Sequence, residues 1–164
     1  MWTVNNSGVY VMDTYYPIGS QTSDLIDDIE VIFDFDHNND LHVGGVPDSI
    51  ESEGDVALVI VGDRYRLDTS EEEVWLTRDD KAYGPDTVSQ WGAIHAEENG
   101  AGGFDVLWER INGDYAKWSV DGTGAYQSDI YMPVGSLSDT DVWELETTFE
   151  ADLDGDLLIG EPIP

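Results

Sequence analysis

The 164-residue sequence contains no cysteine, only six Lys and Arg residues together, and no long apolar run. Without cysteine, neither a disulfide nor a thiolate-ligated metal can stabilise the fold. The scarcity of basic residues argues against a nucleic acid partner, because phosphate binding draws on clustered Lys and Arg. No apolar run reaches the roughly 18 residues that a membrane-spanning helix needs. We therefore expect no nucleic acid partner and no membrane span.

Acidic residues are abundant: 36 Asp and Glu bring the formal net charge to −30. The chain is also 40% hydrophobic and 11% aromatic, which is enough to build a core, so we expect a folded domain rather than a disordered one. An acidic surface with so few basic residues is typical of a halophilic protein, because high salt screens the repulsion, over about 3 Å at 1 M. Most of the charge is then an adaptation to the environment.

An internal repeat organises the chain. A shift of 116 residues aligns residues 2–44 with 118–160 without a gap, and 15 of these 43 positions are identical. We interpret 1–44 as the C-terminal part of a preceding repeat (hairpin, helix and acidic loop) and 45–164 as one complete repeat of about 116 residues, cut from a tandem array. An old duplication within one compact domain is the alternative.

The shared block predicts the same elements in both copies. A hairpin comes first, with WTVN or WSVD as one strand and GVYVMD or GAYQSD as the other. A helix follows over 23–34 and over 139–150, with Thr22 and Ser138 as candidate N-caps and acidic residues in the first turn. Apolar residues recur at helical spacing along one face of each helix.

The unshared middle, residues 45–117, favours β structure and contains the best linker candidate, 45–55. β-Branched and aromatic residues separated by short Gly and Asp turns predict strands in the following segments: 56–62, 64–68, 73–79, 91–98, 103–110 and 115–121. The expected fold class is α+β, mainly antiparallel β, with one helix plus an EF-hand-like calcium loop per repeat.

Each predicted helix runs into an acidic loop, DFDHNNDLHVG (34–44) or EADLDGDLLIG (150–160). Oxygen ligands at positions 1, 3 and 5 and a main-chain carbonyl at position 7 are how an EF-hand-like loop holds Ca²⁺. The spacing predicts these metal ligands: Asp36, Asn38, Asp40 and the carbonyl of His42 in the first loop, and Asp152, Asp154, Asp156 and the carbonyl of Leu158 in the second. Val43 and Ile159 would turn inward as apolar anchors.

Two positions depart from the EF-hand pattern. Position 6, normally Gly, is Leu41 or Leu157, and position 12, normally a bidentate Glu, is Pro47 or Ile163. A complete site therefore needs water or a carboxylate from elsewhere, and it would bind Ca²⁺ weakly, with Kd roughly 10⁻⁴ to 10⁻³ M. The candidate distant carboxylates are Glu30, Asp34, Glu146, Glu150 and Glu161. The alternative is a solvated acidic turn that binds no metal.

The repeated block resembles the tryptophan-rich repeat described as a C-terminal domain of cyanobacterial proteins. The residues that carry the resemblance are the W-x-V…G-x-Y start at 118–126, the E-T-T-F helix end at 146–149, the D-L-D-G-D-x-x-I-G loop at 152–160, and the stretch WGAIHAEENGAGGFDVLWER at 91–110. The resemblance implies a calcium-associated, non-catalytic part of a large secreted or cell-surface bacterial protein, such as an adhesin, a matrix protein or a toxin.

The leading hypothesis is therefore a non-catalytic, Ca²⁺-binding structural module of an extracellular or cell-surface repeat protein, with neighbouring repeats or identical subunits as partners. No nucleophile, phosphate-binding or zinc-protease motif indicates an enzyme. Two alternatives remain. Exposed Trp and Tyr side chains could bind surface glycans in a carbohydrate-binding module, or the half-repeat 1–44 could exchange strands with another subunit and form filaments.

Overall fold

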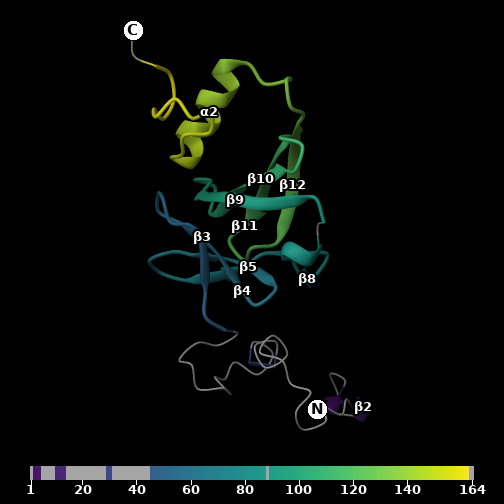
Figure 1. Cartoon of the computed structure of the whole chain (residues 1–164). Helices are drawn as coiled ribbons and strands as arrows, with labels where there is room; N and C mark the ends of the chain where they lie inside the picture. Colours follow the sequence, from purple (N-terminus) through teal and green to yellow (C-terminus); the bar gives the residue numbers. More distant parts are fainter. Residues whose placement is uncertain (1, 5–9, 14–28, 31–44, 88, 163–164) are drawn as a thin grey trace. The chain divides into compact units, whose positions relative to one another are not determined.

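A computed structural model describes residues 2–4, 10–13, 29–30, 45–87 and 89–162 (Figure 1). The chain separates into two compact units, Met1–Val46 and Pro47–Pro164. The predicted division into a half-repeat and a complete repeat stays a prediction.

The first unit contains a hairpin of β1 (Trp2–Val4) and β2 (Tyr10–Asp13). Its pairing reproduces that of β11 (Tyr115–Asp121) and β12 (Tyr126–Met132) in the second unit. Trp2 pairs with Asp13 as Trp118 pairs with Asp129, and both ladders shift register just before the following valine. The hairpin predicted in both copies is confirmed, and the two copies share the position of the register shift.

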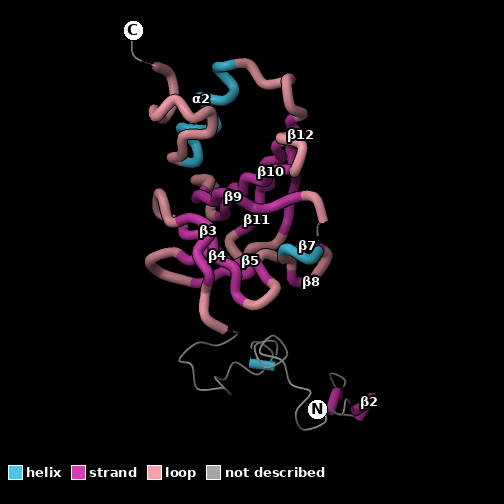
Figure 2. Tube along the Cα trace, viewed as in Figure 1, coloured by secondary structure: helices cyan, strands magenta, loops and turns pink. Residues whose placement is uncertain are grey.

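The second unit contains two four-stranded antiparallel sheets, each a meander in chain order (Figure 2). The first sheet consists of β3 (Asp48–Glu51), β4 (Ala57–Val61), β5 (Arg64–Asp68) and β6 (Glu73–Trp75). The second consists of β9 (Trp91–Glu98), β10 (Gly103–Arg110), β11 and β12. Within the predicted linker 45–55, residues Asp48–Glu51 form β3 and pair with β4, while the boundary between the two units falls at Val46 and Pro47 of the same segment.

A third, two-stranded sheet joins the two larger ones. It consists of β7 (Thr77–Arg78) and β8 (Lys81–Ala82), and the 3₁₀ turn η1 (Pro85–Thr87) follows. Asp79 and Asp80 connect the strands with φ of 54° and 58°. Positive φ at both central residues is the geometry of a type I′ hairpin turn, which Asp tolerates better than most residues. This turn is one of the short Gly and Asp turns expected between strands of the middle segment.

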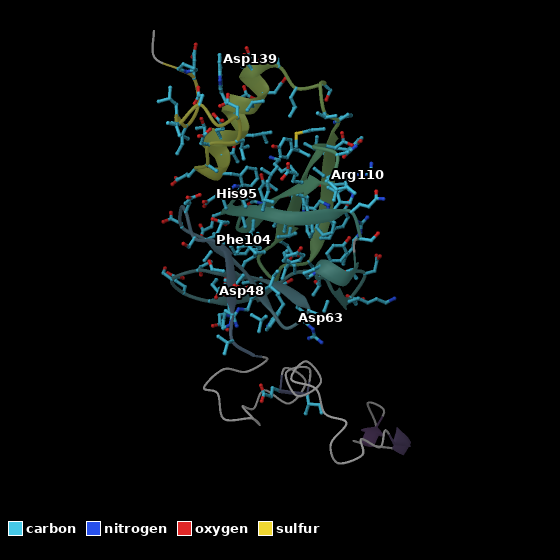
Figure 3. The ribbon with its side chains drawn as sticks, viewed as in Figure 1. Asp48, Asp63, His95, Phe104, Arg110 and Asp139 are labelled. Carbon is cyan, nitrogen blue, oxygen red and sulfur yellow. The ribbon has the colours of Figure 1, made fainter. Side chains whose placement is uncertain are left out.

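The main core lies between the two larger sheets, because alternate residues of their strands point at each other. Along β11, Ala116, Trp118 and Val120 are buried while the residues between them are partly exposed. Leu58 and Leu67 of the first sheet pack into the same cluster. The labelled Phe104 lies in this core, whereas the labelled Asp48 and Asp63 are exposed (Figure 3). Burying these apolar side chains is the main stabilising term of the fold.

The helix α2 (Asp139–Phe149) forms a third layer on the other face of the second sheet (Figure 1). Leu145 and Phe149 of α2 pack on Leu107 of β10 in a second apolar cluster. β10 is therefore buried on both faces around Leu107, because Phe104, Val106 and Trp108 pack in the main core while Leu107 packs under α2.

The predicted α+β class is wrong. The described residues are close to all-β: the second unit holds three antiparallel sheets and the single short helix α2. The class is wrong because the strands predicted in the unshared middle outweigh the helix: these β-branched and aromatic segments supply most strands of the second unit. In the first copy Ile29 and Glu30 are helical, and the rest of that predicted helix lies outside the described residues. No helix in the described part of the chain has both the length and the apolar character that crossing a bilayer requires.

Candidate functional site

The candidate metal-binding loop begins where α2 ends. Ser138 caps the helix: its side chain accepts from the Asp141 N–H, and the Asp141 side chain accepts from the Ser138 N–H. This reciprocal capping box confirms Ser138 as the predicted N-cap and fixes the start of the helix. At the other end, Glu150 adopts a left-handed conformation with φ of 51° and stops it. The helix end therefore presents the loop in one defined direction.

Glu146 anchors the loop from within. The residue is fully buried, and its carboxylate accepts three backbone N–H groups of the loop. Oε1 accepts from Leu153 at 3.0 Å and from Asp154 at 3.2 Å, while Oε2 accepts from Gly160 at 3.0 Å. Hydrogen bonds to an ionised carboxylate are stronger than neutral ones, so three of them offset much of the cost of burying the charge. Glu30, the equivalent residue of the first copy, is also helical and fully buried.

The aspartates of the loop fold the backbone around themselves. The Asp152 carboxylate accepts the N–H of Gly155 at 2.7 Å and that of Leu157 at 2.9 Å. Asp154 accepts from Asp156 at 2.9 Å, and Asp156 accepts from Leu158 at 2.8 Å. These side-chain-to-backbone turns hold residues 152, 154 and 156 at alternating positions of a tight loop.

The structure brings two of the predicted ligands together with a third carboxylate. Glu146, Asp152 and Asp154 each offer one oxygen, and the three oxygens lie within 4.8 Å of one another. Asp156 lies outside this group of described residues, and its carboxylate faces the Leu158 N–H. Of the five distant carboxylates considered in the sequence, Glu146 is the one that reaches the loop in the described residues. The first loop, with Asp36, Asn38, Asp40 and His42, lies outside the described residues.

Two details of the second loop correct or explain the sequence pattern. Leu157 occupies the position normally held by Gly and adopts φ of 70°, so the sharp turn is made in spite of its side chain. Ile159 is 56% exposed, so its expected role as an inward-facing apolar anchor is wrong. The buried Glu146 carboxylate, rather than an apolar side chain, holds the returning chain at Gly160.

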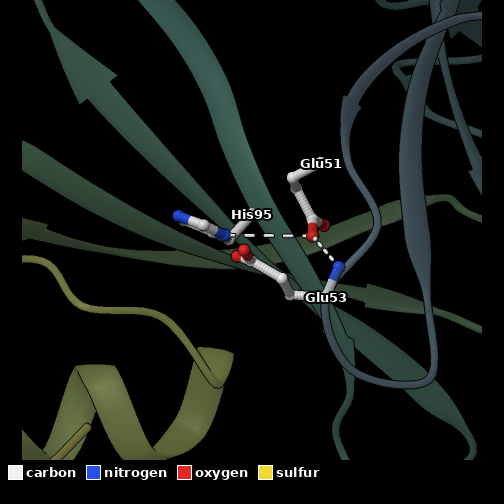
Figure 4. Close-up of side chains that lie close together, drawn as sticks. All are labelled: Glu51, Glu53 and His95. Atoms are coloured by element: carbon white, nitrogen blue, oxygen red, sulfur yellow. Dashed lines mark hydrogen bonds and ion pairs between the residues drawn. The ribbon is translucent and has the colours of Figure 1, made fainter. Parts of the chain in front are cut away.

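A second group of ligand-type side chains lies where β3 ends beside β9. Glu51, Glu53 and His95 each offer one atom within 4.8 Å of the others, so this group could also hold an ion. The Glu51 carboxylate accepts the Glu53 N–H at 3.0 Å and lies 3.9 Å from His95 Nδ1 (Figure 4). Burial raises the pKa of Glu51 and lowers that of His95, so the corner favours the neutral form of both groups.

Glu97 lies next to this group and is only 8% exposed. Its Oε2 accepts the Asp55 N–H at 3.4 Å, and its Oε1 has no hydrogen-bond partner among the described residues. Burial raises its pKa to about 7, with repulsion from Glu150, Glu51 and Asp55 acting in the same direction. Gly54 makes this arrangement possible, because a Cβ there would lie 1.7 Å from Glu97 Oε1 and the local φ is 74°.

Sequence reasoning missed this corner because it depends on pairing that composition does not reveal. The Ala96 N–H donates to Glu51 Oε1 at 3.2 Å across a separation of 45 residues. Treating 45–55 as a linker removed Glu51 and Glu53 from consideration. The sequence did contain a signal for this corner. His95 and Glu97 lie two residues apart on one strand, so their titratable side chains are on the same face of the sheet.

The tryptophans divide between core and surface. Trp108 and Trp118 are buried in the main core. The other tryptophans of the second unit are only partly buried and keep part of their surface exposed: Trp75, Trp91 and Trp143.

A family model for the tryptophan-rich Synechocystis species C-terminal domain matches residues 59–160. The match covers more than half of the chain, so this protein belongs to that family, and the resemblance seen in the sequence is confirmed. No curated protein and no solved structure matches the chain.

Proposed function

We propose that this member of the tryptophan-rich domain family is a non-catalytic structural module that binds Ca²⁺ through the loop following α2. The proposal rests above all on one observation: carboxylate oxygens of Glu146, Asp152 and Asp154 lie within 4.8 Å of one another. Ca²⁺ prefers oxygen ligands at about 2.3–2.6 Å, so one ion between these groups could contact all three.

The ligands have different roles in this proposal. Asp152 and Asp154 are exposed and supply most of the charge. The Leu158 carbonyl is proposed as the main-chain ligand, and Asp156 as a ligand through water. Glu146 Oε1 already accepts two N–H groups, whereas Oε2 accepts one, so Oε2 is the oxygen with capacity left for a cation.

Binding would stabilise the module because the loop concentrates negative charge on a chain that already carries −30. A divalent cation relieves the repulsion among the aspartates and ties the loop to the end of α2. Few charged ligands and an incomplete twelfth position imply weak affinity, of the kind that fills only in extracellular, millimolar calcium. We therefore also propose a secreted or cell-surface location and a role in an adhesin, matrix or filament, with neighbouring repeats or identical subunits as partners.

Thermal unfolding tests the calcium proposal. At about 10 mM Ca²⁺ and a Kd near 0.5 mM, mass action adds about 2 kcal/mol, which raises Tm by roughly 4–8 °C over the value in EGTA. Because any salt screens so acidic a chain, Mg²⁺ and NaCl at the same ionic strength serve as references. We expect the rise in Tm with Ca²⁺ to exceed the rise with Mg²⁺ and the rise with NaCl.

The double variant Asp152→Asn, Asp154→Asn removes two charges while an amide oxygen remains to hold each turn. This variant should lose the additional rise in Tm that Ca²⁺ gives and keep the rise that any salt gives. Glu161→Gln, an exposed acid outside the group, is the matched control and should keep both. Equal shifts with Ca²⁺ and Mg²⁺, or an unchanged Ca²⁺ increment in the double variant, would refute the proposal.

A further inference from the structure

A cavity of about 280 Å³ lies against the second sheet and the short strand β7. It shares no residue with the calcium loop and does not depend on the proposed metal. The residues of its wall that matter here are Arg78, Tyr83, Trp91, Trp118, Asp129 and Tyr131. Ligand pockets range from about 300 to 1,000 Å³, so this cavity suits a single ring rather than a larger molecule.

Aromatic rings form most of this cavity's wall and are fixed by one another. The Trp118 and Tyr83 rings lie 4.7 Å apart between centroids, and Trp118 is buried, so the base of the cavity is rigid. At the rim, Trp91 and Tyr131 meet edge to face at 6.1 Å, and Tyr131 is 51% exposed. The Tyr131 hydroxyl donates to Asp114 at 2.5 Å, which fixes the orientation of this outer ring. The cavity is therefore preorganised and has an exposed aromatic rim.

Arg78 is an unusual cation for this protein. Its guanidinium lies 4.2 Å from the Tyr126 ring centroid and 5.2 Å from that of Trp118. Although the chain holds six acids for every base, no carboxylate of the described residues forms a salt bridge with Arg78. A guanidinium has five N–H donors in a planar fork, so donors remain for another partner.

Two further polar groups belong to the same wall. Asp129 accepts from the Tyr126 hydroxyl and is exposed, so part of its carboxylate can accept other hydrogen bonds. Trp108 also lines the cavity, and its buried Nε1–H has no hydrogen-bond partner in the described structure. Rigid aromatic faces thus occur beside both donors and an acceptor, the combination that gives small-molecule sites their specificity.

We propose that this cavity binds one neutral pyranose ring, as the terminal sugar of a glycan. One face of a pyranose presents C–H groups that pack on the electron-rich face of an aromatic ring. Its hydroxyls both donate and accept, which matches Asp129 as acceptor and Arg78 as donor. Arg78 disfavours cations, and Asp129 together with the net charge of −30 disfavours anions. The charges of Arg78 and Asp129 and the small volume of the cavity disfavour long apolar ligands.

Indole N–H signals in a ¹H–¹⁵N NMR titration test this proposal directly. The probes are methyl glycosides of glucose, galactose, mannose and N-acetylglucosamine, each added up to about 50 mM, since lone sugars bind weakly. We expect at least one sugar to shift the signals of Trp91, Trp108 and Trp118 in a saturable manner. Trp75 and Trp143 lie outside the cavity wall and should not move. The shifts should be the same in Ca²⁺ and in EGTA, which separates this site from the calcium loop.

Variants assign the binding to the cavity. Arg78→Gln and Asp129→Ala should each weaken the sugar at least tenfold, and Trp143→Phe, outside the cavity, should not change it. Unchanged Trp75 and Trp143 signals in the first two variants show that they are folded. The proposal is overturned by no saturable shift with any sugar, by undiminished binding in both cavity variants, by tighter binding of the corresponding uronates, or by binding of adenosine alone.

Discussion

Two corners of the second unit each bury a glutamate, but they offer its carboxylate different numbers of backbone N–H groups. At the end of α2, Glu146 is fully buried and accepts three backbone N–H groups. Beneath the β3–β4 turn, Glu97 is 8% exposed, accepts one N–H at 3.4 Å and leaves an oxygen without a partner.

The difference lies in how much backbone the surrounding chain can offer. The loop after α2 turns back on itself, so the N–H groups of Leu153, Asp154 and Gly160 all point at one carboxylate. At the other corner the Ala96 N–H is taken by Glu51, Glu97 receives one N–H from Asp55, and Glu51, Asp55 and Glu150 add repulsion. There the uncharged form is favoured, and the pKa of Glu97 rises to about 7 because of burial above all. A buried acid is thus an anchor in one corner and a titrating group in the other.

Removing the anchor should have the largest effect. Glu146→Ala leaves three loop N–H groups facing an apolar void, and we expect the free energy of unfolding to fall by about 4 kcal/mol in urea titrations. Glu146→Gln should fall between Ala and wild type, because its amide N–H₂ would face the Gly160 N–H.

Glu144→Ala is the matched control for this change, since Glu144 is exposed on the same helix. It should alter stability by less than about 0.5 kcal/mol. A cost for Glu146→Ala no larger than the control's would show that the loop does not depend on the anchor.

Glu97 should make stability depend on pH. Its pKa is about 7 in the folded state against 4.5 ordinarily, so the folded protein binds the proton more tightly than the unfolded chain. The contribution of Glu97 to the free energy of unfolding is fully present below pH 4.5 and is lost as the pH rises through 7. In EGTA we expect this group to cost about 2–3 kcal/mol between pH 5 and pH 8.

Glu97→Gln isolates this contribution. It should be more stable than wild type at pH 8, by about 2 kcal/mol, and nearly equal to it at pH 5. The neighbouring Glu98→Gln is exposed and should leave the pH profile unchanged. A difference in stability between Glu97→Gln and wild type that is the same at pH 5 and pH 8 would contradict a raised pKa.

The smallest effect concerns strain in the anchored loop. Leu157 has φ of 70° and is 88% exposed, so its side chain costs backbone energy and buries little area. Leu157→Gly should raise the free energy of unfolding by about 0.5–1 kcal/mol, the relief of strain exceeding the added entropy of the unfolded chain. Leu158→Gly has no positive φ to relieve and should destabilise by a similar amount. If both glycines lower Tm, Leu157 is not strained.

The sequence predicted the local features of these corners well. The helix was expected over 139–150 and runs Asp139–Phe149, because its cap and its apolar spacing are short-range signals. β5, β9, β10 and β11 begin and end at the predicted residues for the same reason. The loop was singled out correctly as an acidic turn, but Glu146 was one of five equal candidates, since spacing alone does not tell which carboxylate points inward.

The sequence by itself determined the repeat, the strands, the capped helix and the acidic composition, all of which depend on nearby residues or on their periodicity. Only the tertiary structure decided which acids are buried and what they meet. The contact of Glu97 with Asp55 spans 42 residues and that of Glu51 with Ala96 spans 45. The aromatic cavity likewise draws on β7, β9, β10, β11 and β12. Such contacts follow from sheet order and packing, which bring distant residues together without leaving a local pattern.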